Sequence, residues 1–249
     1  MAAEKAGKKV AKKKVRKNSK KKPRVAKSKA TKSSNHVSDA TVKRLSKYYR
    51  TLQNALSADK TTISSEEIGK LNGLTAAQVR KDLSFFGAFG RRGLGYSVVD
   101  LHRAISKILG LHKTWNVCLV GVGNIGTALV HFKQFAEQGF IIKAVFDSDP
   151  QKVGHSVGDM NVHDFANAKQ VIEDENIKIA VVAVPAHAAQ KVVDQLVDAG
   201  IRAILNFAPI SIFVPKTVSV RNENMAIEIE ALSYALSSRG QKPRQILEQ

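Results

Sequence analysis

The chain has 249 residues, of which 43% are hydrophobic, and its formal net charge is +19. This apolar content is enough to fill the cores of two modest domains. No stretch approaches the roughly 18 apolar residues that a membrane span requires, and the single cysteine, Cys118, excludes a disulfide within the chain. We therefore expect a soluble, cytoplasmic protein.

The basic charge lies in the N-terminal half. Residues 1–35 hold 15 Lys and Arg and one acidic residue, whereas residues 114–249 carry a net charge of −2. Charge confined to one end suggests that this end meets a polyanion. Residues 1–36 form a Lys-rich tail without aromatic residues, which we expect to be disordered. It is either a source of extra phosphate contacts with DNA or a solvated or targeting extension.

Ordered structure is expected to begin at about Asp39 with an amphipathic helix. Its apolar residues recur at alternating spacings of three and four, which places them on one helix face. These residues are Val42, Leu45, Tyr49, Leu52 and Leu56.

Two short helices follow, and each begins with a capping-box pattern. In the first, Ser64 can cap the amide three residues on while Glu67 reaches back. This helix should stop at Gly73, where glycine can adopt the left-handed conformation. A second box, Thr75 to Gln78, opens a helix that should run to about residue 86. Two short helices joined by a tight turn are typical of a helix-turn-helix.

The second of these helices has the properties of a recognition helix. Val79, Leu83 and Phe86 share its inward face, so its opposite face is small, polar and basic, as entry into a major groove requires. Residues 87–96 hold four glycines with two arginines at the tip, which predicts a hairpin wing. The candidate DNA-binding residues are Gln78, Arg80, Lys81, Ser84, Arg91, Arg92 and Tyr96.

A dinucleotide-binding pattern begins after a helix at about residues 98–109. The apolar run 115–120 predicts a buried parallel strand, and it leads into GVGNIG, residues 121–126, and an amphipathic helix containing Ile125, Leu129, Phe132 and Phe135. The three glycines serve the turn, close approach of a pyrophosphate, and helix–strand packing. The candidate residues of this loop are Gly121, Val122, Gly123, Asn124, Ile125 and Gly126.

The next predicted strand, about 141–146, ends at Asp147, 21 positions after Gly126. An acidic residue there accepts hydrogen bonds from an adenosine ribose and repels a 2′-phosphate, so NAD(H) is favoured over NADP(H). Two alternatives remain open: a glycine turn that only packs, and coenzyme A, whose ADP portion can use a similar cradle.

Further strand–helix units extend the pattern. We expect strands at 179–184 and 204–209 with a helix near 186–199 between them, so that Val184, Pro185 and Asn206 lie near the nicotinamide. A last apolar helix, about 226–237, is predicted to pack on a partner subunit. The fold class is α/β, a winged helix-turn-helix followed by a Rossmann doubly wound parallel sheet. The expected boundaries are 1–36 for the tail, 37–112, 113–222, and 223–249 for the last helix.

The cofactor-binding half leaves little room for catalysis. Residues 114–249 are barely enough for a Rossmann fold, and the seven histidines form no catalytic or metal-ligand grouping. We therefore assign no catalytic and no metal-binding residues, and we expect the bound redox state to be a signal. The alternatives are an oxidoreductase with a basic accessory domain and a nucleoid-associated protein whose tail dominates.

From about residue 41 to 240 the chain resembles the Rex family of redox-sensing transcriptional repressors. This resemblance implies operator DNA as partner, NADH as the effector that relieves repression, and a homodimer whose C-terminal helix is swapped. The segments that carry it are LSKYYRTL, ISSEEIGKLNGLTAAQVRKDLSFFGAFGRRGLGY, ILGLHKTWNVCLVGVGNIGTAL, FDSDPQKVG, AVPAHAAQ and ILNFAP.

Two residues depart from the family pattern. The resemblance implies that the DNA-binding half is coupled to the cofactor-binding half through two residues. One is an arginine at the end of the first helix, and the other is an aspartate in a V-x-V-x-N-x-D segment. Arg50 matches the arginine, but Asn224 stands at the place of the aspartate, and Phe132 stands where the family has a tyrosine. Asparagine cannot form a charge-assisted pair, so the resemblance predicts a regulator whose NADH response is weak or absent.

Overall fold

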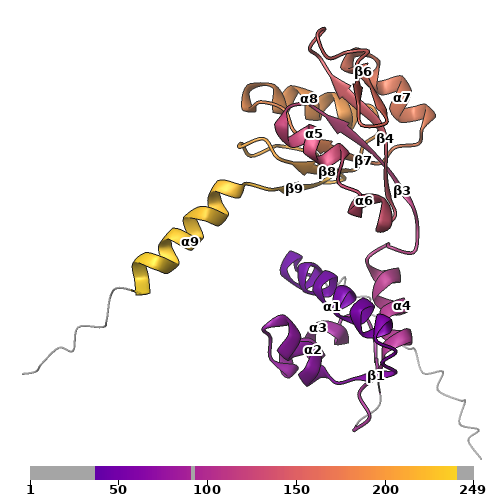
Figure 1. Cartoon of the computed structure of the whole chain (residues 1–249), viewed down its shortest axis with the longest axis vertical. Helices are drawn as coiled ribbons and strands as arrows, with labels where there is room; N and C mark the ends of the chain where they lie inside the picture. The colour runs from indigo at the N-terminus through magenta and orange to yellow at the C-terminus, as the bar shows by residue number, and fades with distance from the viewer. Residues whose placement is uncertain (1–36, 91–92, 240–249) are drawn as a thin grey trace, which may run out of the picture. The chain divides into compact units, whose positions relative to one another are not determined.

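The computed structural model describes residues 37–90 and 93–239 (Figure 1). The Lys-rich tail, residues 1–36, lies outside the described residues. Within the two described ranges, no helix is long and apolar enough to cross a membrane.

The first part of the described chain contains four helices and a two-stranded antiparallel ribbon. Strand β1 pairs with β2 through Thr62 opposite Ser97 and Ile63 opposite Tyr96. The elements are α1 (Asp39–Ser57), β1 (Thr62–Ile63), α2 (Ser65–Asn72), α3 (Ala76–Ser84), β2 (Tyr96–Ser97) and α4 (Val98–Ile108).

The N-cap half of each predicted capping box forms, whereas the Glu67 carboxylate, which was expected to reach back, binds the Lys60 amine. The Ser64 Oγ accepts from the Glu67 amide at 3.0 Å, and the Thr75 Oγ1 accepts from the Gln78 amide at 3.2 Å. Gly73 has a φ of 66°, the left-handed conformation that favours glycine. Helix α3 ends at Ser84, two residues before the expected end.

These elements enclose a hydrophobic core of their own. The buried residues of this core all come from α1 to α4 and the β1–β2 ribbon. Its buried members are Leu45, Tyr48, Leu52, Ile63, Ile68, Val79, Leu83, Tyr96, Val98, Leu101 and Ile105.

The second part is a seven-stranded sheet with the order β5-β6-β4-β3-β7-β8-β9, parallel except for the β5–β6 pair. The direction of winding reverses between β3 and β7, which is where doubly wound folds bind ligands. The strands are β3 (Trp115–Val120), β4 (Phe140–Asp147), β5 (Ser156–Val157), β6 (Met160–Asp164), β7 (Ile179–Val182), β8 (Ala203–Asn206) and β9 (Ser219–Asn222).

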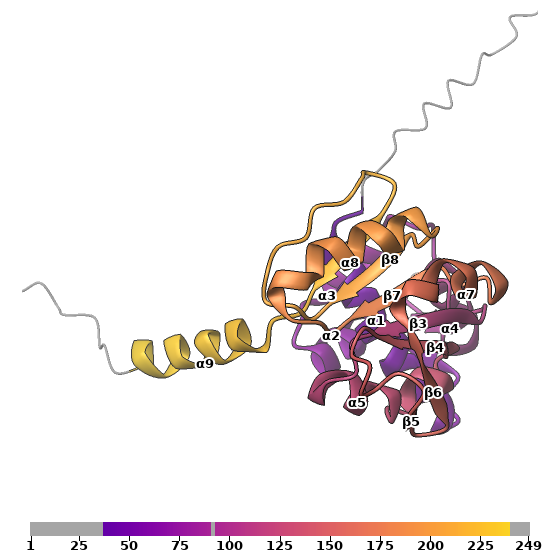
Figure 2. The same cartoon turned by 90° about the horizontal axis from the view of Figure 1, so that it is seen from above.

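Helices cover the two faces of this sheet unequally, as Figure 2 shows from above. Helices α7 (Ala168–Asp174) and α8 (Ala186–Asp198) pack on the face that buries Cys118 and Val120. Helix α5 (Asn124–Val130) packs on the opposite face with Val117 and Leu119. Burial raises the pKa of the Cys118 thiol to about 12, so this cysteine is a small apolar core residue.

The helix after the glycine loop is shorter than expected. The prediction of one helix through Phe135 is wrong, because α5 ends at Val130 and a separate short helix, α6, spans Gln134–Glu137. The ring Nδ1 of His131 lies 2.8 Å from the Thr127 carbonyl, while the His131 amide is 3.4 Å from that oxygen. Competition for this carbonyl weakens the last helical hydrogen bond, and the chain leaves the helix.

Helix α9 (Met225–Arg239) is the last described element. Its large apolar side chains are all more than half exposed. Exposure of so many apolar side chains to water is unfavourable and is typical of an interaction surface. They are Met225, Ile227, Ile229, Leu232, Tyr234 and Leu236.

Candidate dinucleotide cleft and DNA-recognition surface

The glycine loop has the geometry that close approach of an anion requires. Gly121 has a φ of 98°, so it makes the turn out of β3. A Cβ on Gly126 would lie 1.9 Å from the Gly121 carbonyl oxygen, so this position packs the helix against the loop. A Cβ on Gly123 would meet nothing within 4 Å, which leaves the space in front of this residue open. Gly123 caps α5 without a side-chain hydrogen bond, so the first helix amides are available to a phosphate.

Asp147 stands at the end of β4 and is bonded to the glycine loop. Its Oδ2 accepts from the Val122 amide at 2.8 Å, and its Oδ1 accepts from the Asp149 amide at 3.0 Å. The Lys152 Nζ lies 3.3 Å from the same Oδ2. Burial opposes ionisation of Asp147, but these donors together outweigh it and lower the pKa of the carboxyl. Asp147 is therefore an anion that fixes the loop and still offers Oδ1 to a ribose hydroxyl.

These groups border a cleft of about 600 Å³, within the range of small-molecule sites. Seven predicted cofactor residues line it. They are Gly121, Gly123, Asn124, Ile125, Asp147, Val184 and Pro185.

Three predicted cofactor residues do not line the cleft. Val122 is 8% exposed and belongs to the sheet core, although its amide binds Asp147. Gly126 is a packing position, as described above. Asn206 is fully buried, and its Nδ2 donates to the carbonyls of Ala208 and Ile210 and to Asn222. The Asn206 amide is used to shape the loop after β8, and its proximity to a nicotinamide stays a prediction.

The cleft also includes residues that the sequence did not single out as candidates. Lys152 lies beside Asp147, and His187 lies at the start of α8. Phe165 and Phe207 add aromatic surface. The segment FDSDPQKVG contains Lys152, but only the fold shows that its amine returns to the aspartate.

The outward face of α3 is the candidate DNA surface. Arg80, Lys81 and Ser84 are exposed on it. The Arg80 Nη1 donates to Ser65 Oγ at 3.0 Å, and the Ser84 Oγ donates to the Lys81 carbonyl at 2.7 Å. Gln78 is half-buried, and its amide nitrogen donates to Asp82 at 2.8 Å instead of reaching back to complete a capping box.

The structure describes only part of the predicted wing, residues 87–96. The one strand described in this segment, β2, pairs with β1 and not with another part of the segment. Arg91 and Arg92 lie outside the described residues. Tyr96 is 8% exposed and packs in the helical core, so its ring supports the β1–β2 ribbon and is not presented on the surface. Gly95, with a φ of 76°, lets β2 approach β1, because a Cβ there would be 2.7 Å from the Ile63 carbonyl oxygen.

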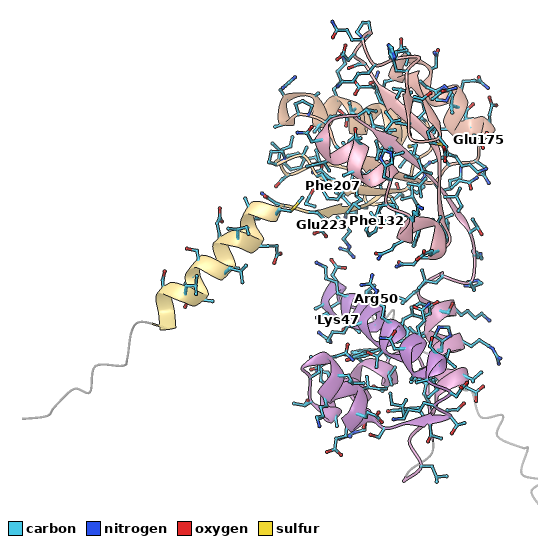
Figure 3. All side chains as sticks on the ribbon, viewed as in Figure 1. Lys47, Arg50, Phe132, Glu175, Phe207 and Glu223 are labelled. Carbon is cyan, nitrogen blue, oxygen red and sulfur yellow. The ribbon has the colours of Figure 1, made fainter. Side chains whose placement is uncertain are left out.

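The three residues predicted to couple the halves have other surroundings, and Figure 3 labels two of them. Arg50 is exposed on α1. Phe132 is 44% exposed and meets Phe135 edge-on at 5.0 Å between ring centroids. The Asn224 Oδ1 accepts from the Ala226 amide at 3.0 Å, so this side chain caps α9. Arg221 of β9, three positions before Asn224, forms an ion pair with Asp39 of α1. Its Nη2 lies 2.6 Å from the Asp39 Oδ1.

Comparison with known proteins agrees with both halves of this geometry. A family model described as a CoA binding domain matches residues 112–210. A second model, described as the N-terminus of a putative DNA-binding protein, matches residues 36–84.

Curated relatives match most of the chain. The redox-sensing transcriptional repressor Rex of Desulfitobacterium hafniense is 46% identical over 203 residues, covering 82% of this chain and 97% of that protein. The Rex protein of Chloroflexus aurantiacus is 45% identical over 199 residues, covering 80% of this chain and 94% of the relative.

Solved structures give the same result. RSP, in complex with β-NAD⁺ and operator DNA, superposes with a TM-score of 0.78 at 39% identity, covering 82% of this chain and 94% of that one. RSP in complex with β-NADH superposes with a TM-score of 0.74 at 37% identity, covering 82% of this chain and 96% of that one. The chain therefore belongs to the Rex family of redox-sensing transcriptional repressors.

Proposed function

We propose that this chain is a DNA-binding transcriptional repressor that senses the NADH/NAD balance, and that NADH relieves its binding to operator DNA. The observation that carries the proposal is the cleft at the ends of β3 and β4, which is lined both by the open position at Gly123 and by Asp147, whose pKa is lowered. The same chain holds a capped helix pair with a polar outer face. The named relatives and the ligands in the RSP complexes support this pairing of functions.

The chemistry of Asp147 favours NAD(H) over the other candidate ligands. NADP carries a phosphate on the ribose 2′ position, and coenzyme A carries one on the 3′ position. Either phosphate would bring negative charge to a carboxylate that is already ionised, while the free ribose of NAD donates hydrogen bonds to it. Lys152 offsets part of this repulsion, because its amine is 3.3 Å from Asp147. Calorimetry with NADH, NADPH and coenzyme A tests the order, and tighter binding of coenzyme A than of NADH would contradict it.

DNA binding is assigned to the outward face of α3. Arg80, Lys81 and Ser84 supply exposed donors, and half-buried Gln78 lies in the first turn of the helix, where recognition helices contact bases. Arg91 and Arg92 of the wing complete the proposed surface with backbone or minor-groove contacts.

A homodimer is the proposed assembly. Six large apolar side chains of α9 are 57 to 75% exposed in the single chain. One face of the sheet also has an uncovered apolar hollow of about 190 Å³. Burial of one such side chain contributes about 1.5–3 kcal/mol, so covering these side chains with a second copy offsets part of the cost of association. The hollow is lined by Val117, Phe135, Gln138, Phe140, Ile142, Ile179, Val181 and Leu205.

Fluorescence anisotropy tests the function. An operator duplex is first selected from random DNA with the NAD-bound protein and then titrated in the presence of NAD or NADH. The proposal predicts preference for the selected duplex over random DNA and weaker binding with NADH than with NAD. Equal affinity for random and selected DNA would instead indicate a nucleoid-associated protein.

An NAD-dependent oxidoreductase is the second candidate, and one observation favours it. His187 lines the cleft at the start of α8, where an imidazole could exchange a proton with a substrate beside the nicotinamide. Incubation with NADH and a panel of small carbonyl compounds separates the candidates. Steady oxidation of NADH that His187→Ala abolishes would establish an enzyme, whereas unchanged NADH absorbance with every compound supports a non-catalytic sensor.

A further inference from the structure

A fully buried carboxylate lies at the junction of α1 and the proposed recognition helix. Asp82 of α3 is 0% exposed and receives hydrogen bonds from two helices. The Arg44 Nε donates to its Oδ2 at 2.6 Å, and the Arg44 Nη2 donates to its Oδ1 at 2.7 Å. The Tyr48 hydroxyl donates to Oδ2 at 2.8 Å, and the Gln78 amide nitrogen donates to Oδ1 at 2.8 Å.

These donors keep Asp82 ionised inside the core. Burial opposes ionisation, but the hydrogen bonds from Arg44, Tyr48 and Gln78 together lower the pKa of the carboxyl. Burial and the hydrogen bond to Asp82 raise the pKa of Tyr48, so its hydroxyl remains a donor. All four described contacts are therefore charge-assisted and directional.

Stability alone does not account for this arrangement. Apolar side chains of similar volume commonly replace a buried ion pair without loss of stability, because the pair must overcome the cost of removing two charges from water. What an apolar contact does not supply is direction. The planar fork of Arg44 meets both oxygens of Asp82, so α3 cannot turn about its axis or slide along α1 without breaking at least one bond.

The same carboxylate fixes the side chain of Gln78. A carboxylate only accepts hydrogen bonds, so the amide nitrogen of Gln78 must face Asp82 and the Oε1 must face away. One amide hydrogen and the Oε1 then remain for a partner. This is the acceptor and donor pair with which a glutamine recognises the edge of an adenine.

We propose that Asp82 is a positioning residue for DNA recognition, which holds α3 in register on α1 and presents the Gln78 amide to one base in a single orientation. This inference rests on the proposed DNA-binding function. It assigns base specificity to Gln78 and phosphate contacts to its exposed neighbours Arg80 and Lys81. Asp82 itself touches no DNA.

The test measures base preference, not overall affinity. A duplex selected by the wild-type protein is compared by anisotropy with duplexes altered at single base pairs, using the wild-type protein, Gln78→Ala and Asp82→Asn. One good bidentate contact discriminates between bases by about tenfold or more. We expect both variants to lose this discrimination at one and the same base pair, while their salt-dependent binding to random DNA is retained. The double variant should lose no more base discrimination than Gln78→Ala alone, because both substitutions remove the same base contact.

Two further variants separate positioning from folding. The triple variant Arg44→Met, Tyr48→Phe, Asp82→Leu replaces the carboxylate and its two α1 partners by apolar groups and keeps Gln78. We expect it to unfold cooperatively and to lack the base preference. Lys81→Ala is the matched surface control, and it should weaken binding to every duplex by a similar factor.

The outcomes distinguish the inference from the function on which it rests. The inference is overturned, and Asp82 has only a structural role, in either of two cases. In the first, Asp82→Asn weakens binding to all duplexes equally. In the second, the loss of base discrimination in Asp82→Asn adds to the loss in Gln78→Ala. If the wild-type protein prefers no duplex over random DNA, the proposed function itself fails, and the inference fails with it.

Discussion

Substitution of the middle glycine of the loop gives the sharpest test of the cleft. Gly123 has φ −93° and ψ −164°, which alanine can adopt, and a Cβ there meets no protein atom within 4 Å. Gly123→Ala should therefore leave the fold and its thermal midpoint nearly unchanged. The added methyl group occupies the space through which a pyrophosphate must approach the α5 amides. Loss of one hydrogen bond to a charged group costs about 1.5–3 kcal/mol, which corresponds to a roughly 10- to 150-fold weaker NADH affinity.

Gly126 provides the matched contrast. A Cβ there would lie 1.9 Å from the Gly121 carbonyl oxygen, so α5 must shift away from β3. Gly126→Ala should destabilise the protein by about 1–3 kcal/mol, as overpacking does, and should also weaken NADH binding. Calorimetry of NADH binding and thermal unfolding measure both effects. If Gly123→Ala binds NADH as tightly as the wild type does, the ligand does not lie over this loop, and the proposed cradle is wrong.

Three further predictions concern charge and assembly. Asp147→Ala removes the acceptor for the Val122 amide and the ribose, so calorimetry should show weaker NADH binding and a smaller preference over NADPH; an unchanged preference would exclude the ribose role. The folded-state pKa values of Asp82 and Asp147 are lowered, so their contribution to the free energy of unfolding is complete above the unfolded value of about 3.9 and is lost as pH falls through the folded values. Urea unfolding between about pH 5 and 2 checks this sign, and a smaller decline in Asp82→Asn supports the assignment. Leu232→Lys places a charge on the apolar surface of α9 and should shift sedimentation equilibrium toward monomer; a dimer as stable as that of Ser233→Lys would locate the interface elsewhere.

The sequence predicted those parts of the molecule whose causes are local. Ser64, Gly73 and Thr75 act through hydrogen bonds and φ values within a few residues, and the structure agrees at each. The glycine loop was predictable for the same reason. The weak point of α5 at His131 was missed, because side-chain competition for one carbonyl is not visible in apolar periodicity.

Contacts between distant segments could not be predicted in this way. Asp82 meets side chains 34 and 38 positions earlier in the chain, so nothing within α3 indicates that its carboxylate is buried. Asn206 does stand at a strand end, as expected, but the loop that follows folds back over it and uses its amide. The edge strands β5 and β9 were not predicted, because each is short and largely exposed and lacks a continuous apolar run.

Asn224 and Phe132 depart from the family pattern, so we expect the link between cofactor and DNA to be weak in this chain. Asn224 uses its Oδ1 to cap α9 and carries no charge for Arg50, and Phe132 offers no hydroxyl. The Arg221–Asp39 pair lies nearby, but its side chains are 48% and 64% exposed, and such pairs contribute at most about 1 kcal/mol.

Asn224→Asp tests this difference. An aspartate can cap α9 as asparagine does. The family pattern implies that an aspartate at this position also pairs with Arg50, and if it does, the substitution should increase the factor by which NADH weakens operator binding. A coupling of about 1–3 kcal/mol corresponds to a 5- to 150-fold effect. Linkage requires operator DNA to weaken NADH binding by the same factor, so both titrations measure one quantity. Arg50→Gln in the Asn224→Asp background is the control, because it should cancel the gain. If the wild-type protein already shows a large, reciprocal NADH effect that Arg50→Gln leaves intact, the coupling does not pass through these residues.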